Sequence, residues 1–254
     1  MKKKTQVLLL LVLFGVLSCD SDKGLTCFKT AGTIIRENIA ISESFNKVTV
    51  FQRVQLVLRD APDVSVTLET GENIRNDIKV FVENGVLNIV NEASCNLVRE
   101  YGITKVFISH PNIEEVRNSS GLPVLGQNII EWPNVKLLSD DLVEEDFFHK
   151  DGDFNLSFNS QNVSIVCNGL SNFFLSGNIE NLDIQLLEGD SRLPLENLNV
   201  NHVKVFHRGT NDIIVSPNES ISGELRSTGN LILKNRPAVL NVETFFTGRV
   251  IISD

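Results

Sequence analysis

Apolar and polar residues alternate along the first third of the chain, from residue 39 to residue 90. The alternating runs lie at 48–58, 64–68, 78–82 and 86–90. Alternation with a period of two places successive side chains on opposite faces of a strand, so each run predicts a β-strand. Asn84-Gly85 separates the last two runs and is a residue pair that tight hairpin turns prefer. No window in this part of the chain has the apolar stripe of a helix.

A different regularity begins near residue 160, where glycines recur at a fixed interval. Gly169, Gly189, Gly209 and Gly229 are evenly spaced, and Gly248 follows at an interval that is shorter by one position. Each interval holds short apolar strand-like pieces that are separated by polar corners. A unit of this size cannot bury its apolar face alone, whereas stacked units bury a continuous column. The spacing therefore predicts stacked structural repeats.

These patterns predict an all-β protein in which an N-terminal region of strands and hairpins leads into a parallel, right-handed β-solenoid. The four glycines would occupy equivalent corners that need a positive φ. Ile184, Val205 and Leu225 would line one internal column. An antiparallel β-sandwich is the alternative, although its turns would recur about every 8–12 residues without a fixed longer period.

The chain divides accordingly into four predicted segments. They are a lipoprotein signal peptide (1–18), a lipidated cysteine with its tether (19–31), an N-terminal β region (32–110) and the glycine-paced repeats (111–254).

The first segment is basic and then apolar. Three lysines at positions 2–4 precede an apolar run at 7–17, and Ser18 and Cys19 follow. This order indicates an export signal, because the run is too short to span a membrane as a helix. The stretch ending in Leu17-Ser18-Cys19 resembles the lipobox of bacterial lipoproteins, with Leu17 where a small residue is usual. The resemblance implies cleavage before Cys19, its lipidation and stable membrane anchoring; a soluble secreted protein is the alternative.

Lipidation leaves three thiols, Cys27, Cys95 and Cys167, in an oxidising compartment where at most one bridge can close. Cys27 and Cys95 both lie at the ends of strand-like elements, where a crosslink causes little strain. We therefore predict a Cys27–Cys95 disulfide. Cys167 lies inside an apolar run and is typical of a small buried residue. The sequence has no pair of thiolates or histidines at zinc spacing, so we expect no metal site built on cysteine.

The charge of the chain disfavours one class of partner. The 254 residues include 23 Lys and Arg against 32 Asp and Glu, a formal net charge of -9, and three of the lysines belong to the signal. An acidic body without a basic patch repels phosphate backbones. We therefore expect no nucleic-acid partner. The predicted partners are the membrane, through the lipid anchor, and an envelope protein or glycan.

Candidate catalytic groups are poorly arranged. His202 and His207 are separated by an odd number of positions and would face opposite sides of a continuous strand, and neither G-x-S-x-G nor H-E-x-x-H occurs. The acidic stretch at 140–146 with Asp151 and Asp153 offers oxygen atoms for Ca²⁺ but lacks EF-hand spacing, so we interpret it as a solvated charged bulge. We predict no catalytic residues, cofactor or metal. A polysaccharide-cleaving enzyme is a less favoured alternative that rests on fold analogy.

Phenylalanine dominates the aromatic residues, with 15 Phe against Trp132 and Tyr101. Sugar-binding faces favour Trp and Tyr, so this composition argues against a dedicated carbohydrate module. Phe-Phe pairs begin at 147, 173 and 245. Strict alternation would turn one ring of each pair outward and mark a partner surface, whereas corners that turn both rings inward are the alternative.

The order of these segments resembles a known bacterial family. The segments that carry the resemblance are 45–48, 54–58, 72–80, 85–89, 103–111, 119–121 and the glycine-paced strands. They resemble the putative auto-transporter adhesin family with a head GIN domain, from about residue 32 to the C-terminus. Segments 27–32 and 95–99 also resemble paired cysteine segments in a lipoprotein subgroup. The Ser-Gly-Ser-Gly corners common in that family are absent here, and the resemblance implies fold and location more than activity.

Together, these features predict a non-enzymatic, lipid-anchored β protein of the bacterial cell envelope that acts as a binding or adhesion module. The predicted location is the outer membrane, with the domain either in the periplasm or at the cell surface. A structural or assembly accessory of other envelope proteins is the alternative function.

Overall fold

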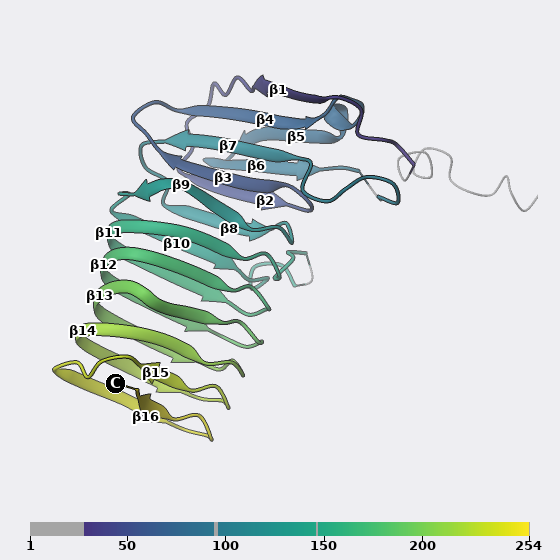
Figure 1. Cartoon of the computed structure of the whole chain (residues 1–254). Helices are drawn as coiled ribbons and strands as arrows, with labels where there is room; N and C mark the ends of the chain where they lie inside the picture. The colour runs from purple at the N-terminus through teal and green to yellow at the C-terminus, as the bar shows by residue number, and fades with distance from the viewer. Residues whose placement is uncertain (1–27, 94–95, 146, 254) are drawn as a thin grey trace, which may run out of the picture.

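The computed structural model describes residues 28–93, 96–145 and 147–253, and within them the protein is all-β. The strands form one curled, mixed sheet of 17 strands, which Figure 1 shows as a pile of rungs with the N-terminal strands at one end and β16 at the other. The helix η1 (Glu72–Asp77) is a short 3-10 turn. No helix in the described residues is long and apolar enough to cross a membrane.

The strands fall into two groups that differ in length. The N-terminal region contains short strands: β1 (Ile34–Asn38), β2 (Lys47–Phe51), β3 (Gln55–Asp60), β4 (Ser65–Gly71), β5 (Ile78–Glu83), β6 (Val86–Asn91), β7 (Lys105–His110), β8 (Glu115–Ser119) and β9 (Val124–Ile130). The C-terminal group, which we call the stack, contains β10 (Asn134–Ser139), β11 (Phe154–Cys167), β12 (Phe173–Leu186), β13 (Leu193–His207), β14 (Ile213–Leu225), β15 (Leu231–Leu233), β16 (Val239–Thr244) and β17 (Val250–Ile252).

Every pairing between strands of the stack is parallel. Val163 of β11 lies beside Leu182 of β12, Leu182 lies beside Val203 of β13, and Val203 lies beside Ile221 of β14. The long strands also bend, because the first half of β11 pairs with β9 and its second half pairs with β10. The chain therefore crosses one face, bends and crosses a second face before the next rung begins. This parallel register excludes an antiparallel sandwich for the stack.

The N-terminal region combines both strand directions. β2 pairs in parallel with β6 and β8, and β3 pairs in parallel with β7 and β9. The pairs β1–β4, β4–β7 and β5–β6 are antiparallel. The sheet as a whole is thus mixed. The antiparallel strands lie at the N-terminal end of the pile, where they cover edges that parallel rungs would leave open (Figure 1).

Two turns in the N-terminal region are explained by backbone angles. Asn84 and Gly85 have φ angles of 51° and 77°, as a two-residue hairpin turn requires, and they join β5 to β6. This confirms the predicted hairpin. The predicted single run at 48–58 is wrong, because Arg53 has a φ of 61° and divides the run into β2 and β3. Alternation did not reveal this corner, since neither glycine nor proline marks it.

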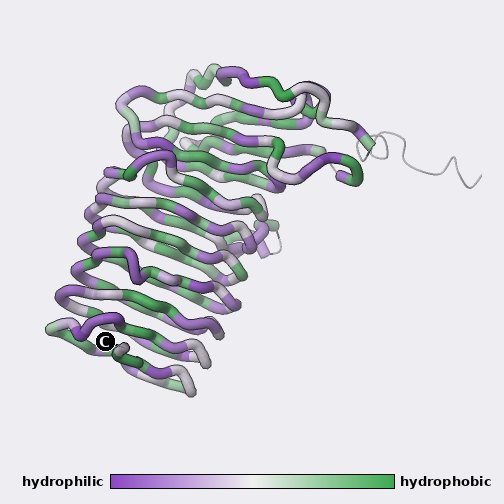
Figure 2. Tube along the Cα trace, in the orientation of Figure 1, coloured by the Kyte–Doolittle hydropathy of each residue, from purple (hydrophilic) through white to green (hydrophobic). Residues whose placement is uncertain are grey.

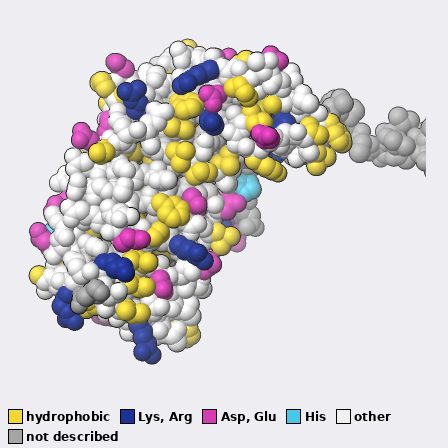
Figure 3. All heavy atoms as spheres, viewed as in Figure 1, with side chains coloured by type: hydrophobic (Ala, Val, Ile, Leu, Met, Phe, Trp, Pro, Cys, Tyr) yellow, Lys and Arg dark blue, Asp and Glu magenta, His cyan; other side chains and the backbone are white. Residues whose placement is uncertain are grey.

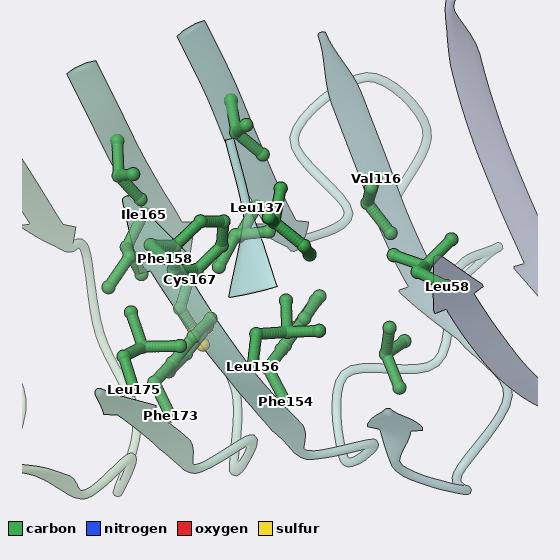
Figure 4. Close-up of a cluster of buried hydrophobic side chains, with 14 of the residues drawn as sticks. Leu58, Val116, Leu137, Phe154, Leu156, Phe158, Ile165, Cys167, Phe173 and Leu175 are labelled. Atoms are coloured by element: carbon green, nitrogen blue, oxygen red, sulfur yellow. The ribbon is translucent and has the colours of Figure 1, made fainter. Parts of the chain in front are cut away.

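The core is a column of apolar side chains enclosed by the rungs. Figure 2 shows hydrophobic positions recurring at matching places in successive rungs. Phe154 and Phe173 occupy equivalent positions of β11 and β12, and their rings stack with centroids 4.9 Å apart (Figure 4). Cys167 is fully buried in the same cluster, which confirms its prediction as a small buried residue.

One predicted column is out of phase. Ile184 lies beside Val205 as expected, but Val205 lies beside Gly223. Leu225 lies beside His207, two positions further along the strand. In the second half of β13 the pairing with β14 therefore advances by two positions fewer than the interval between corner glycines, whereas the first half keeps that interval. The glycine spacing therefore predicts about how many residues form one rung. It does not predict which residues of neighbouring strands lie side by side.

Candidate functional site

The predicted corner glycines lie in successive corners at one edge of the stack. The N–H of the residue after Gly189 donates to the carbonyl of Gly169 (3.0 Å), and the N–H of the residue after Gly209 donates to the carbonyl of Gly189 (3.0 Å). The N–H of Gly229 donates to the carbonyl of Gly209 (3.2 Å). Only Gly189 has a positive φ, at 93°, so the predicted need for positive φ is wrong at the other three.

Close backbone approach is the more general reason for glycine in these corners. A Cβ on Gly189 would lie 2.1 Å from the carbonyl oxygen of Gly169, and a Cβ on Gly169 would lie 2.3 Å from that of Lys150. At Gly209 the nearest atom is in the ring of His207, at 3.1 Å.

His207 is buried behind these corners. Its Nδ1 accepts a hydrogen bond from the N–H of Gly209 (3.2 Å), which leaves Nε2 to donate to the carbonyl of Asn211 (2.9 Å). Burial lowers the pKa of His207 below its usual value of 6.5 because it disfavours the charged ring. Neutral His207 therefore stabilises the corner by bonding to the backbone of Gly209 and Asn211. Its ring is not positioned to act on a molecule in solvent.

Three of the predicted site residues, Cys19, Cys27 and Cys95, lie outside the described residues. The segments next to Cys27 and Cys95 are nevertheless in contact, because Nη1 of Arg99 donates to the carbonyl of Lys29 (2.7 Å). Sγ of Cys167 lies 3.1 Å from Oγ of Ser191, and burial raises the pKa of this thiol. Cys167 is thus a poor nucleophile.

The acidic stretch after β10 is only partly the solvated bulge that the sequence suggests. Asp140 and Asp141 are buried, and the prediction is wrong for them. Oδ2 of Asp140 lies 3.3 Å from Nη1 of Arg117, and Oδ2 of Asp141 lies 2.8 Å from Nζ of Lys150. Oδ1 of Asp141 also accepts a hydrogen bond from the side-chain amide of Asn168 (2.7 Å). The two carboxylates hold the base of this loop, and no group of three metal-ligating side chains occurs among the described residues.

A shallow groove of about 440 Å³, lined by polar residues and by the apolar residues between them, crosses the face that the second halves of the long strands form. One column of its wall consists of residues that immediately precede each apolar strand segment: Asn134, Asn162, Asn181, His202 and Ser220. The side-chain amide of Asn162 donates to Oδ1 of Asn134 (2.7 Å), and that of Asn181 donates to Oδ1 of Asn162 (2.9 Å). We call this surface the ladder groove.

A second column of the ladder groove combines charged side chains of both signs with serines. In register from β10 to β14 it contains Lys136, Ser164, Asp183, Lys204 and Ser222. Asp183 and Lys204 also line an adjoining hollow of about 490 Å³. Sequence reasoning missed this surface because it sought catalytic clusters. The signal that would have found it is a polar residue directly before each apolar segment, as in Asn162-Val163 and Asn181-Leu182.

The face formed by the first halves of the long strands carries a column of apolar side chains. Phe174 is exposed while Phe173 is buried, which confirms the predicted outward ring for this pair. Ile214 and Ile232 are half-buried neighbours in adjacent rungs, and Ile251 continues their column into β17. Figure 3 shows hydrophobic side chains on this face among charged ones.

Solved structures with the same fold include proteins from Bacteroides and Parabacteroides. A putative adhesin from Bacteroides fragilis NCTC 9343 has a TM-score of 0.72 and 16% identity, covering 88% of this chain and 99% of that one. A putative lipid binding protein from Parabacteroides distasonis ATCC 8503 has a TM-score of 0.61 and 11% identity, with 88% and 98% covered. A putative adhesin from Parabacteroides merdae ATCC 43184 has a TM-score of 0.58 and 15% identity, with 89% and 100% covered.

Among curated proteins, none matches the chain. Residues 44–237, which include the ladder groove and the corner glycines, match the family described as "Putative auto-transporter adhesin, head GIN domain". This match agrees with the resemblance that the strand order and the glycine spacing suggested. Because it covers most of the chain, the protein belongs to the head GIN domain family of putative auto-transporter adhesins.

Proposed function

We propose that the protein is a non-enzymatic, lipid-anchored binding protein of the bacterial outer membrane, with an adhesion-like role. In this proposal the stack is a right-handed parallel β-solenoid that presents the ladder groove to its ligand. Family membership supports the adhesion-like role, and the lipobox at Leu17-Ser18-Cys19 supports the anchor. The observation that carries the proposal is the in-register repetition of polar side chains along the groove.

The ladder groove fits an extended, hydroxyl-rich chain, and we therefore propose a linear glycan as the ligand. Neighbouring rungs lie about 4.8 Å apart, so amides and hydroxyls recur along the groove at a spacing close to the size of a sugar ring. The groove offers few of the aromatic anchors that dominate protein interfaces. Without Trp or Tyr to stack on sugars, each contact is weak, and affinity depends on occupying several rungs at once.

The test is binding of purified linear polysaccharides to the immobilised mature protein. Lys136 and Lys204 are exposed in the groove, so Lys136→Glu/Lys204→Glu changes its charge without altering the core. We expect this variant to bind at least about ten-fold more weakly, as the loss of two charge-assisted contacts implies. Lys234→Glu is the matched control, because Lys234 is exposed but lies outside the groove. Equal affinity of the wild type and both variants contradicts the assignment of the groove.

A second function, as an assembly partner of other envelope proteins, is favoured by the apolar face. Phe174, Ile214 and Ile251 form a stripe of the kind that marks protein interfaces. Capture of an envelope protein that is lost in Phe174→Ser and retained in Lys136→Glu/Lys204→Glu would favour this function over glycan binding.

A further inference from the structure

Exposed apolar side chains gather on the side of the N-terminal region where the described chain begins. We define the apolar rim as seven side chains that are 50% to 83% exposed: Phe28, Leu97, Val98, Tyr101, Leu142, Val143 and Phe147. They come from the start of the described chain, from the segment between β6 and β7, and from the loop that follows β10. Figure 1 shows these segments on the same side of the molecule, and Figure 3 shows hydrophobic side chains gathered on that side.

Contacts place the segments that carry the rim beside one another. Arg99 binds the carbonyl of Lys29, which connects Leu97 and Val98 to Phe28. Nη2 of Arg53 donates to the carbonyl of Ala93 (3.1 Å), and both residues line a hollow with His149. These contacts place the start of the described chain beside the segment between β6 and β7, and place the end of β6 beside His149, which follows the loop after β10.

Aromatic packing fixes the remaining part of the rim. The ring of Phe51, at the end of β2, lies 5.8 Å from the rings of both Phe147 and Phe148. The guanidinium of Arg117 lies 4.5 Å from the centre of the Phe148 ring, and Arg117 is also the partner of buried Asp140. The loop that carries Leu142 and Val143 is thus held at its base by buried contacts, although its tip is apolar and exposed.

The length of chain before the rim indicates what covers it. Phe28 is the first described residue, and Cys19, the predicted lipidation site, precedes it by nine positions. A segment of that length spans at most about 30 Å even when fully extended. A lipid on Cys19 would therefore keep Phe28, and the part of the rim next to it, within that distance of the bilayer. Such a tether raises the local lipid concentration, so weak apolar contacts suffice.

We propose that the apolar rim lies on the lipid surface that holds the anchor, so that the stack projects away from the membrane and leaves the ladder groove accessible. This orientation rests on the lipid anchor of the proposed function. The attraction is apolar rather than electrostatic, because Glu144 and Glu145 are exposed between Val143 and Phe147 and oppose anionic lipid. Contact is accordingly stronger on phosphatidylcholine than on phosphatidylglycerol, and on phosphatidylcholine it depends weakly on salt.

The test measures which end of the protein touches lipid. Tyr101→Trp places a fluorescent probe in the rim, and Phe246→Trp places a matched probe in an exposed position between β16 and β17. The full-length protein is purified from a bacterial host and reconstituted in phosphatidylcholine vesicles with brominated chains, and the wild type supplies the background of buried Trp132. We expect quenching of the Tyr101→Trp signal at least three-fold greater than that of Phe246→Trp.

The experiment tests the lipid anchor and the contact between the rim and lipid independently. Vesicle flotation and the mass of the N-terminal peptide report the anchor, whereas the ratio of quenching reports the rim. Floating protein with equal quenching of the two probes overturns the rim and retains the anchor. Protein without a lipid on Cys19 overturns the anchor, and preferential quenching of Tyr101→Trp by added vesicles then still supports the rim. If added vesicles do not quench Tyr101→Trp more than Phe246→Trp in that case, the rim proposal is overturned.

Discussion

The N-terminal region and the stack use the same parallel pairing but connect it differently. In the stack, Val163 pairs with Leu182 and Leu182 with Val203, so each partner lies one repeat further along the chain. In the N-terminal region, Lys47 pairs with both Val86 and Glu115, which lie much further away in the sequence. The chain leaves each N-terminal rung and returns after a hairpin or an edge strand. A repeat is visible in the sequence only where each rung is followed directly in the chain by the rung with which it pairs.

This difference also separates how the two regions gain stability. Each rung of the stack contacts mainly its two neighbours, so its stability is close to a sum of rung and interface contributions. The N-terminal region brings together residues far apart in the sequence, which costs more loop-closure entropy before contacts form. It compensates with an end covered by antiparallel strands. The two regions should therefore respond differently to matched substitutions.

The largest expected effect is the loss of a core ring. Phe173 is fully buried against Phe154, whereas Phe51 is only half-buried in the aromatic cluster near the rim. Phe173→Ala should lower the free energy of unfolding by about 3–5 kcal/mol, and Phe51→Ala should lower it by about 1–2 kcal/mol. Urea denaturation followed by circular dichroism measures both values. Similar losses would mean that the stack core is not the better packed of the two.

The second effect compares two glycines. A Cβ on Gly223 of the stack would lie 1.8 Å from the carbonyl oxygen of Val205, and its φ is 138°. Gly85 of the N-terminal hairpin also has a positive φ, but nothing lies within 4 Å of its Cβ position. Gly223→Ala should cost about 3 kcal/mol and Gly85→Ala about 1 kcal/mol of unfolding free energy.

The comparison of these glycines tests whether close backbone approach adds to the cost of a positive φ, which both glycines have. Thermal unfolding of both alanine variants at neutral pH gives the ranking. If Gly85→Ala is the more damaging variant, backbone angle rather than rung contact determines where glycine is required.

The smallest effect is a pH dependence confined to the stack corner. Because the pKa of His207 is lowered in the folded state, its contribution to stability is complete above pH 6.5 and is lost as the pH falls through the folded pKa, when the unfolded chain binds the proton first. His207→Gln should flatten the decrease in melting temperature between pH 7.5 and about pH 5, a window set by the usual histidine pKa. His149→Gln, at an exposed position, is the control. An unchanged pH profile in His207→Gln would show that another group, such as buried His110, dominates.

The sequence predicted those parts of the fold that depend on short-range pattern. The alternating runs became β2 to β6, and Asn84-Gly85 became a hairpin, because both signals lie within a few residues. The strand β1 was not predicted, since its pairing with β4 depends on residues far along the chain. The buried state of Asp140 likewise depends on Arg117, which approaches it only after the rungs have stacked.

The candidate site was harder to predict than the fold. No residue of the ladder groove is unusual in type, and its character comes from repetition of Asn, Ser and Lys at matching heights. Matching heights require the register, and the register shifts by two positions between β13 and β14 relative to the glycine spacing. The strand pattern and the family resemblance both indicated an all-β fold, but neither indicated which face carries the groove.

Because each strand of the stack pairs with strands close to it in the sequence, the number of rungs determines the length of the stack. Because each rung contacts mainly the rungs beside it, one rung can be duplicated or deleted in evolution without rebuilding the N-terminal region. Each such event would change the reach of the protein by about 4.8 Å, the separation of neighbouring strands. Relatives with different numbers of rungs would then present the same kind of groove at different distances from the N-terminal region.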